Sequence, residues 1–523
     1  PEGLPAVVTL TLALGVRVMA DENALVRRLP AVEALGAVDV ICTDKTGTLT
    51  EGQMAVSRVW VADAVHDLDG NRADGGTPGG AGTEETPAGP GRTGTDTGAD
   101  GDADRVDRLL RAGALCNDAT LEDGDPTERA LVAAAADQGV DIDALREENP
   151  RTDEVPFSSE TKWMGTVHDD VGYVKGAPEV VLGKSARILT ANGPAPLTDE
   201  VAERVREQVV AFADDALRVL AVAYAEDGDV DGELVFLGLA GMIDPPRAEV
   251  AEALAATERA GIAVKMVTGD NVRTAAAVAG ELGMGEDVME GREVEKASDA
   301  ELAEAVESVD VFARSSPEHK VRILRALQNN GHVVAMTGDG VNDAPALKNA
   351  DIGVAMGVRG TDVAKQASDM VLLDDNYATI ERAVERGRAI FDNVWKFVAY
   401  LLSANVAEVA IVFLASLFGY LVLPAVQLLW INLLTDGLPA LALGADPQSG
   451  DVMERPPRDP DRGIVGGQML GFIGGAGTVS VAVMLGLMVY ALDGAPEVTP
   501  YAMTMVFTGF VVIEFAKLYV IRW

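Results

Sequence analysis

The chain has 523 residues, 48% of them hydrophobic, and its 82 acidic and 42 basic side chains give a net charge of −40. This length predicts several domains, and so acidic a chain is not expected to bind nucleic acid, because phosphate contacts need a basic surface. The acids are scattered, which favours a heavily solvated, halophile-like surface over an acidic patch for a cationic partner. Cys42 and Cys116 lack metal-ligand spacing and favour a reducing, cytoplasmic compartment.

Apolar regions lie at both ends of the chain. Residues 6–16 are apolar, about half of the roughly 20 residues that cross a bilayer. We therefore predict that 1–20 is the second half of a broken transmembrane helix. The chain begins at Pro1 rather than at a methionine and ends just after an apolar run, so we expect an internal fragment of a longer protein.

Residues 21–390 predict an α/β cytoplasmic part. Short β-rich runs alternate with alanine- and charge-rich helical stretches, and three runs end in a Gly/Asp/Thr turn: 38–42, 264–267 and 333–336. This pattern predicts a parallel sheet with ligands at the carboxyl ends of its strands. Residues 66–104, rich in Gly, Thr, Asp and Pro, cannot bury enough apolar surface and are predicted to be a disordered insert.

Residues 391–523 predict an α-helical transmembrane domain with four helices, at 395–420, 424–443, 467–492 and 500–521. Arginines gather in the 445–463 loop, and further basic residues precede the first span. The positive-inside rule therefore places this loop and the α/β part in the cytoplasm. We expect a multi-pass protein of the cell membrane.

The strongest motif is Asp44-Lys-Thr-Gly-Thr, which directly follows an apolar strand. A carboxylate nucleophile can split ATP hydrolysis into two easier steps through an aspartyl-phosphate. The amides of the turn and Lys45 can hold phosphoryl oxygens. A lone aspartate more often caps a turn, but the complete string makes that reading very weak.

Two further strand-end motifs support phosphoryl transfer: Thr268-Gly269-Asp270 and Thr337–Asp343. In the second motif, Asp339 and Asp343 offer the oxygen ligands that Mg²⁺ prefers. Lys320 offers a cation for the phosphate. Single residues of these types usually just face solvent, so the prediction depends on the combination.

Polar side chains inside the apolar spans indicate a cation path, because acids in a membrane are costly. Glu2 lies in a Pro- and Gly-broken segment, where free carbonyls can coordinate cations. The later spans carry Asn405, Glu408, Asn432, Thr435, Asp436 and Glu514. These oxygen ligands suit a hard cation such as calcium. Glu514, near a span end, could instead reach the surface, and Lys517 one turn later is unusual beside a cation site.

These motifs resemble those of P-type ATPases. Asp44-Lys-Thr-Gly-Thr is similar to the family's phosphorylation motif and 337–347 to its hinge motif, while 242–247 and Lys175-Gly-Ala-Pro-Glu179 are similar to two further elements. The resemblance covers essentially the whole chain in family order. It implies a haloacid-dehalogenase-like phosphorylation domain at 21–53 and 231–390, split by an α+β nucleotide-binding domain at 54–230.

The resemblance also implies roles for residues, with ATP and Mg²⁺ as cofactors. Asp44 would accept the phosphoryl group, and Mg²⁺ would bind Asp44, Asp339 and the carbonyl of Thr46. The remaining catalytic positions would be Lys45, Thr268, Gly269, Asp270, Lys320, Asn342 and Asp343. Phe157 would stack on adenine, and the other nucleotide-binding residues would be Glu128, Lys162, Lys175, Gly176, Arg218, Asp244 and Arg314.

At the membrane positions the chain resembles the sarcoplasmic-reticulum-type calcium pump, which implies ATP-driven calcium export. A pump for sodium, protons or manganese is the alternative. The family's actuator domain carries a Thr-Gly-Glu loop that this chain lacks, so we expect the fragment alone to be incomplete for turnover. Two other classes are less favoured. A soluble haloacid-dehalogenase-type phosphatase would not need membrane spans, and a non-enzymatic scaffold would not need the Asp44 motif.

Overall fold

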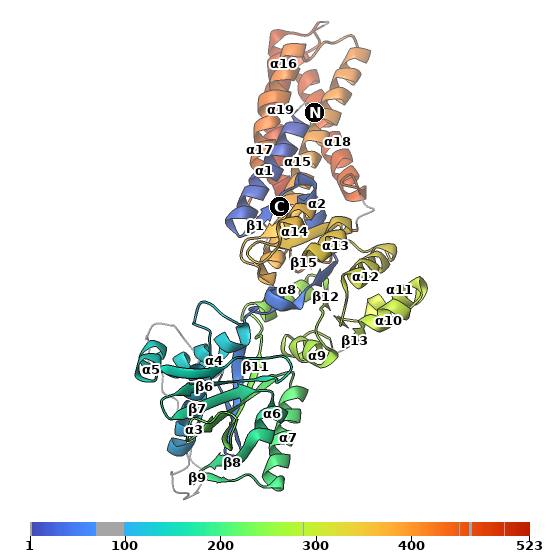
Figure 1. The fold of residues 1–523 in the computed structure, drawn as a ribbon. Helices are drawn as coiled ribbons and strands as arrows, with labels where there is room; N and C mark the ends of the chain where they lie inside the picture. The colour runs from blue at the N-terminus through green and yellow to red at the C-terminus, as the bar shows by residue number, and fades with distance from the viewer. Residues whose placement is uncertain are drawn as a thin grey trace, which may run out of the picture. The chain divides into compact units, whose positions relative to one another are not determined.

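The computed structural model describes residues 3–68, 99–285, 287–448, 450–459, 463–495 and 497–522. They form two compact units (Figure 1). The first unit contains Pro1–Leu49, Arg247–Asp270 and Ala279–Trp523, and the second contains Thr50–Pro246 and Asn271–Val278.

The soluble part of the first unit is built on an eight-stranded sheet of order β1-β17-β16-β15-β2-β12-β14-β13. All neighbours are parallel except β1 and β17. The strands are β1 (Ala24–Val26), β2 (Val40–Thr43), β12 (Ala263–Val267), β13 (Val288–Glu290), β14 (Val311–Ala313), β15 (Val334–Gly338), β16 (Ile352–Met356) and β17 (Met370–Leu372). The parallel sheet expected from the three short runs is therefore confirmed, with β2 between β12 and β15.

The central strands are buried on both faces, as expected for parallel strands covered by helices. Their Val, Met and Cys side chains pack in one cluster with Phe312, Ile323 and Leu327. The helices of this part are α2 (Leu29–Leu35), α8 (Val250–Arg259), α10 (Gly291–Lys296), α11 (Asp299–Ser308), α12 (Pro317–Asn329), α13 (Ala344–Asn349) and α14 (Asp362–Ala367). Helix α9 (Val272–Glu281) is divided between the two units.

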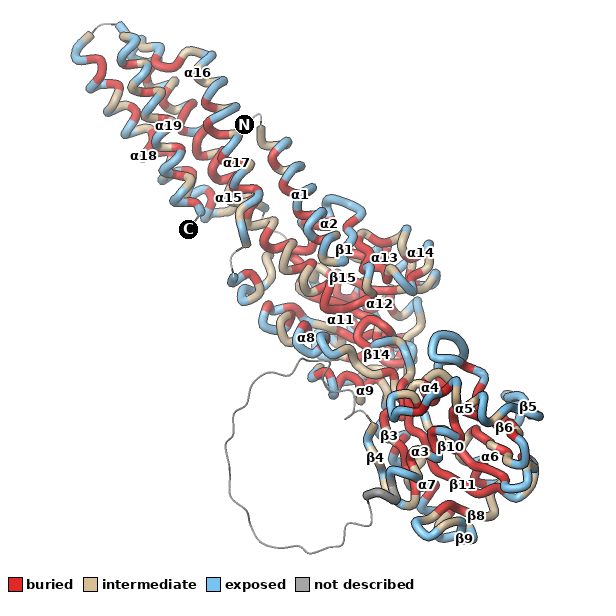
Figure 2. Tube along the Cα trace, turned by 90° about the vertical axis from the view of Figure 1, so that its left-hand side faces the viewer, coloured by how far each residue is buried: buried red, intermediate tan, exposed pale blue. Residues whose placement is uncertain are grey.

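The first unit also contains a helix bundle. Its elements are α1 (Leu4–Asp21), α15 (Tyr377–Leu417), α16 (Ala425–Trp430), a π-helical turn (Ile431–Thr435), α17 (Gly437–Gly444), α18 (Gly467–Leu492) and α19 (Pro500–Arg522). In the part of the chain that the structure describes, five helical segments are long and apolar enough to cross a membrane. Large apolar side chains such as Val426, Leu433, Val489 and Val512 are exposed on these helices, as expected for a surface that faces lipid. Exposed stretches alternate with buried ones along α18 and α19 (Figure 2).

One of these helices differs from the sequence prediction. Helix α15 begins at Tyr377 rather than near 395, because Asn376 caps its first turn and no proline interrupts the next 41 residues. Helix α1 spans 18 residues, Leu4–Asp21, close to the predicted segment 1–20. The other segments agree closely with the prediction, although the second one contains the π-helical turn.

The second unit is a largely antiparallel sheet with covering helices, in which β8 and β11 pair in parallel. Its strand order is β4-β3-β11-β10-β7-β6-β5, and β8 pairs with β11 and β9. The strands are β3 (Ala55–Val61), β4 (Ala64–Asp67), β5 (Arg151–Val155), β6 (Trp163–His168), β7 (Val171–Gly176), β8 (Ser185–Thr190), β9 (Gly193–Pro196), β10 (Arg218–Ala225) and β11 (Leu234–Ile243). The helices are α3 (Ala99–Leu115), α4 (Pro126–Asp137), α5 (Ile142–Glu148), α6 (Pro178–Lys184) and α7 (Asp199–Asp214).

The unit boundaries differ from those expected. Strand β11 pairs with β3 and β10, so residues 231–246 belong to the second unit and not, as predicted, to the phosphorylation domain. The predicted disordered insert, 66–104, overlaps β4 at one end and α3 at the other. Its residues 69–98 lie outside the described residues.

Candidate active site and cation site

Asp44 lies at the carboxyl end of β2, between the ends of β12 and β15. Its amide donates to the Thr337 hydroxyl over 2.8 Å, and the Lys45 amide donates to the Asp44 carboxylate over 2.7 Å. These bonds fix a half-buried carboxylate at the sheet edge where parallel-sheet proteins bind ligands. The structure therefore brings together strand ends that the sequence only predicted to be neighbours.

Two lysines flank this carboxylate. Lys320, in the first turn of α12, lies 2.7 Å from Asp44 and 3.0 Å from Asp343. Lys45 Nζ lies 2.6 Å from the carboxylate of Asp270. Burial alone would lower the pKa of Lys320, but the carboxylates of Asp44 and Asp343 outweigh it and raise that pKa above its ordinary value. Lys320 is thus a permanent cation aimed at the carboxylate that would react.

Three carboxylates, those of Asp44, Asp339 and Asp343, offer oxygen atoms that all lie within 4.8 Å of one another. Burial and the charges of the other two raise the pKa of Asp339. Asp343 also accepts hydrogen bonds from the amides of Asp339 and Gly340, at 3.2 and 3.0 Å, which orders the loop after β15. A crowded, all-oxygen set of this kind fits Mg²⁺, whose charge would relieve the repulsion.

Arg359 is a residue of this site that the sequence did not single out. Its guanidinium donates to the Thr46 carbonyl over 2.8 Å, so that carbonyl is already hydrogen-bonded in the geometry seen here. Asp375 holds the Arg359 loop by accepting bonds from the amides of Gly357, Val358 and Arg359. The available signal was the glycine-flanked turn that follows β16, another strand of the same parallel sheet.

The remaining predicted positions of the first unit lie around this cluster. Thr268 is buried at the end of β12, and its hydroxyl accepts from the Asp270 amide over 3.2 Å. Asn342 is exposed in the turn Val341–Asp343. Arg314 lies further out, where its side chain donates to Glu290 over 3.3 Å and its amide to the Asp270 carbonyl.

The predicted adenine-binding residues of the second unit also converge. The register joins Gly176 of β7 to Trp163 of β6 and to Ala221 of β10, which brings the Lys162 turn beside Lys175 and Gly176. A side chain at Gly176 would meet the Lys162 carbonyl at 2.5 Å, so this approach requires glycine. Arg218 begins the adjacent strand β10.

Charge and exposure differ sharply within this group. Lys175 is buried and pairs with Glu128, at the start of α4, over 2.8 Å. Phe157, in contrast, is 64% exposed. An exposed aromatic ring and a buried cation are the two kinds of group that a stacked base and its phosphates require.

Asp244 has a different environment from the one expected of a nucleotide-binding residue. It is buried, and its carboxylate accepts hydrogen bonds from the Thr50 hydroxyl at 2.5 Å and the Gly52 amide at 2.7 Å. These contacts tie the residues before β3 to those after β11. The geometry therefore gives Asp244 a structural role, which is to join the two ends of the segment Thr50–Pro246 of the second unit.

The polar residues of the bundle form a second cluster. Asn432, in the π-helical turn, donates to Glu408 of α15 over 2.9 Å. Asp436 follows that turn and is fully buried, and neither of its oxygens has a hydrogen-bond partner among the described residues. Tyr400 donates to the Thr435 carbonyl over 3.3 Å.

Three other predicted cation ligands are placed differently. Glu514 is fully buried in α19, so the alternative that it reaches the surface is wrong. Asn405 bonds the carbonyl of Leu401 in its own helix and lines an open apolar groove with Val409 and Phe413. Glu2 lies outside the described residues.

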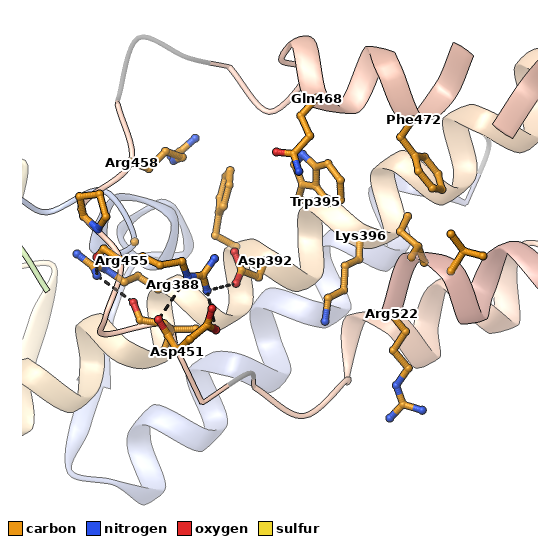
Figure 3. A pocket seen from close by; sticks show the side chains of 16 residues that line it. Arg388, Asp392, Trp395, Lys396, Asp451, Arg455, Arg458, Gln468, Phe472 and Arg522 are labelled. Atoms are coloured by element: carbon orange, nitrogen blue, oxygen red, sulfur yellow. Dashed lines mark hydrogen bonds and ion pairs between the residues drawn. The ribbon is translucent and has the colours of Figure 1, made fainter. Parts of the chain in front are cut away.

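A basic pocket of about 640 Å³ lies where the bundle helices α15, α18 and α19 approach residues 451–458 (Figure 3). Its charged lining comprises Arg388, Asp392, Lys396, Asp451, Arg455, Arg458 and Arg522. Arg455 pairs with Asp392 over 2.7 Å, and Arg388 donates to the carbonyls of Val452 and Arg455. This concentration of basic side chains fits the predicted cytoplasmic position of the 445–463 loop.

Comparison with known proteins adds two family models. Residues 105–249 match "P-type ATPase, cytoplasmic domain N", and residues 420–523 match "Cation transporting ATPase, C-terminus". A calcium-transporting ATPase of Bacillus subtilis is 41% identical over 98% of this chain and 59% of its own length. Calcium-transporting ATPase type 2C member 1 of Homo sapiens is 42% identical over 88% of this chain and 50% of its own length. The chain thus spans about half the length of the curated relatives it matches.

Proposed function

Because this chain belongs to the P-type ATPases, we propose that the full-length protein uses ATP to move calcium across the cell membrane through a phosphorylated Asp44. The observation that carries the proposal is the cluster at the end of β2. There a carboxylate nucleophile, a buried lysine and two further carboxylates converge. The names of the relatives, calcium-transporting ATPases, support the choice of cargo.

In the proposed reaction, one oxygen of the Asp44 carboxylate attacks the γ-phosphorus of ATP. A new P–O bond forms, the bond to the β,γ-bridging oxygen breaks, and ADP leaves with that oxygen's electron pair. Lys320 and the amides of the 44–48 turn stabilise the charge on the transferred group. Mg²⁺, held by Asp44 and Asp339, would neutralise phosphate charge and orient the reacting oxygens.

The second unit would hold the nucleotide. Phe157 would stack on adenine, while Lys175, Lys162 and Arg218 would supply positive charge, with Glu128 fixing Lys175 by their ion pair. Gly176 would allow the close backbone approach. Asp244 is left out of this set because its carboxylate is already bonded to Thr50 and Gly52.

Asp436, Glu408 and Asn432 would form the centre of the cation path, with Thr435, Asn405 and Glu2 as further candidate ligands and Glu514, paired with Lys517, beside them. Oxygen ligands on a broken helix suit a hard cation. A π-helical turn, closed by a hydrogen bond from the Asp436 amide to the Ile431 carbonyl, interrupts the α-helical pattern just before Asp436.

The test is phosphorylation of the full-length protein with γ-labelled ATP, in membranes, with an Asp44→Asn control. We expect acid-stable label that requires calcium and vanishes in the variant, a loss of at least about 10³-fold given the role of a nucleophile. Label that depends instead on sodium, manganese or low pH would keep the pump and change its cargo. Label that persists in Asp44→Asn would refute the assignment of the nucleophile.

A further inference from the structure

Lys517 places an ammonium group inside the helix bundle. It lies in α19, three residues after Glu514, and its Nζ is 2.5 Å from the Glu514 carboxylate. The lysine is 6% exposed and the glutamate 0%. Nζ also lies 3.5 Å from the Ser403 hydroxyl and 5.9 Å from the centre of the Tyr400 ring, both on α15. The ammonium is therefore held between two helices and does not reach towards the surface.

The neighbouring carboxylates have no such partner. Both oxygens of Asp436 and one oxygen of Glu408 accept no hydrogen bond from the residues described. Asp436 interacts electrostatically with Glu408, Glu514 and Lys517, so the four charged groups form one cluster. Unpaired carboxylates in an apolar bundle are costly and call for a cation from outside. Glu514 alone has its cation supplied by the chain.

The charge of this cluster limits how many ions it can hold. When ionised, its three carboxylates carry three negative charges, and Lys517 returns one positive charge. One divalent cation neutralises the remainder, whereas a second would leave the buried cluster strongly positive. Because Nζ lies 2.5 Å from an oxygen of Glu514, the ammonium is in direct contact with that carboxylate. The ammonium thus occupies the space in which a cation bound to Glu514 would lie.

We propose that Lys517 is a tethered cation which blocks a second ion position beside Glu514, so that each cycle carries one divalent cation, bound at Asp436 and Glu408. This inference rests on the proposed transport function and specifies its stoichiometry. Lys517 determines the number of ions bound through its charge and position, and it does not contact the transported ion.

The test measures equilibrium binding of radioactive calcium to the purified full-length protein, per site that can be phosphorylated from labelled ATP. For the wild type we expect one calcium per site and a Hill coefficient near one. In Lys517→Gln, the stoichiometry should rise above one and binding should become cooperative. Lys517→Arg, which keeps the charge, should remain at one. The double variant Glu514→Gln/Lys517→Gln removes both members of the pair and should also bind one.

Two calcium ions per site in the wild type would overturn the inference. So would a Lys517→Gln protein that folds, becomes phosphorylated and still binds one ion with wild-type affinity. If Lys517→Gln fails to fold, the double variant decides, because a stoichiometry other than one contradicts the charge argument. Failure of the proposed function is distinguishable, since it would abolish calcium-dependent phosphorylation of the wild type itself.

Discussion

The two clusters of carboxylates in the first unit differ in how many of their negative charges are paired with a lysine. At the end of β2, Asp44 and Asp343 share Lys320, and Asp270 pairs with Lys45, so each of these three carboxylates has a lysine partner. In the bundle, Asp436 has no partner among the described residues, and only Glu514 has a lysine. The first arrangement is preorganised for chemistry. The second arrangement leaves the negative charge of Asp436 without a counter-charge, and a transported cation would supply it.

The largest effect is expected from removing the counter-charge of the first cluster. Lys320→Met should slow phosphorylation of Asp44 by roughly 10²–10³-fold, the range found when one stabilising donor is lost from such a site. Labelled ATP in single-turnover experiments measures it. Lys348→Met, an exposed lysine on α13, is the matched control. A Lys320→Met rate within about threefold of the wild type would show that the pairing is only structural.

A smaller effect on a different quantity is expected in the bundle. Asp436→Asn removes the unpaired charge, so the calcium concentration for half-maximal phosphorylation should rise on the order of 100-fold, equivalent to about 2.7 kcal/mol. Glu497→Gln, an exposed acid between α18 and α19, should leave it unchanged. An unaltered calcium dependence in Asp436→Asn would place the cation elsewhere and remove the contrast between the clusters.

The second unit provides a third test with a smaller expected effect, because there an uncharged ring, that of Phe157, is proposed to bind adenine. Phe157→Ala should raise the KM for ATP about 10-fold, since loss of one base–aromatic stack costs roughly 1–3 kcal/mol. Its effect on the maximal rate should be small. Phe157→Tyr should behave like the wild type, because the ring is 64% exposed and tyrosine keeps an aromatic face for stacking. Equal KM values for Ala and Tyr would argue that the ring does not contact adenine.

Local sequence predicted the elements of both clusters but not their pairings. The strand before Asp44 and the spans at 467–492 and 500–521 were recognisable because each has a continuous apolar run with polar or glycine-rich ends. Lys320 and Asp44, however, are 276 positions apart, and only the fold brings them within 2.7 Å. The same holds for Arg359 and the Thr46 carbonyl.

Two further differences have physical reasons that sequence patterns do not express. The sequence of β11 is compatible with a strand in either unit. Only its hydrogen bonds to β3 and β10 assign it to the second unit. Helix α15 continues from the soluble part into the bundle because α2 packs against it, with Gly387 allowing the approach of Leu35. Apolar periodicity detects only the membrane portion of such a helix.

The smallest expected effect concerns His332, which lies at the amino-terminal edge of the eight-stranded sheet, opposite the edge that carries Asp44. His332 lies 2.9 Å from Asp39 and 3.1 Å from Glu307. Burial alone would lower the pKa of His332, but its hydrogen bonds to both carboxylates raise that pKa above the ordinary value. A raised folded-state pKa stabilises the fold fully below the unfolded-state value, about 6.5, and that stabilisation disappears as pH rises through the folded-state pKa.

His332→Gln should therefore lower the Tm more at pH 5.5 than at pH 8.5, by a few degrees at most, because both partners are partly exposed and such pairs contribute about 1 kcal/mol or less. Thermal unfolding of the purified protein measures the difference between variant and wild type at each pH, with His66→Gln of the second unit as the control. An equal loss at both pH values would mean that His332 acts by packing rather than by charge. The pairing of charges would then matter only at the reactive edge of the sheet, where Lys320 is buried and solvent cannot replace it.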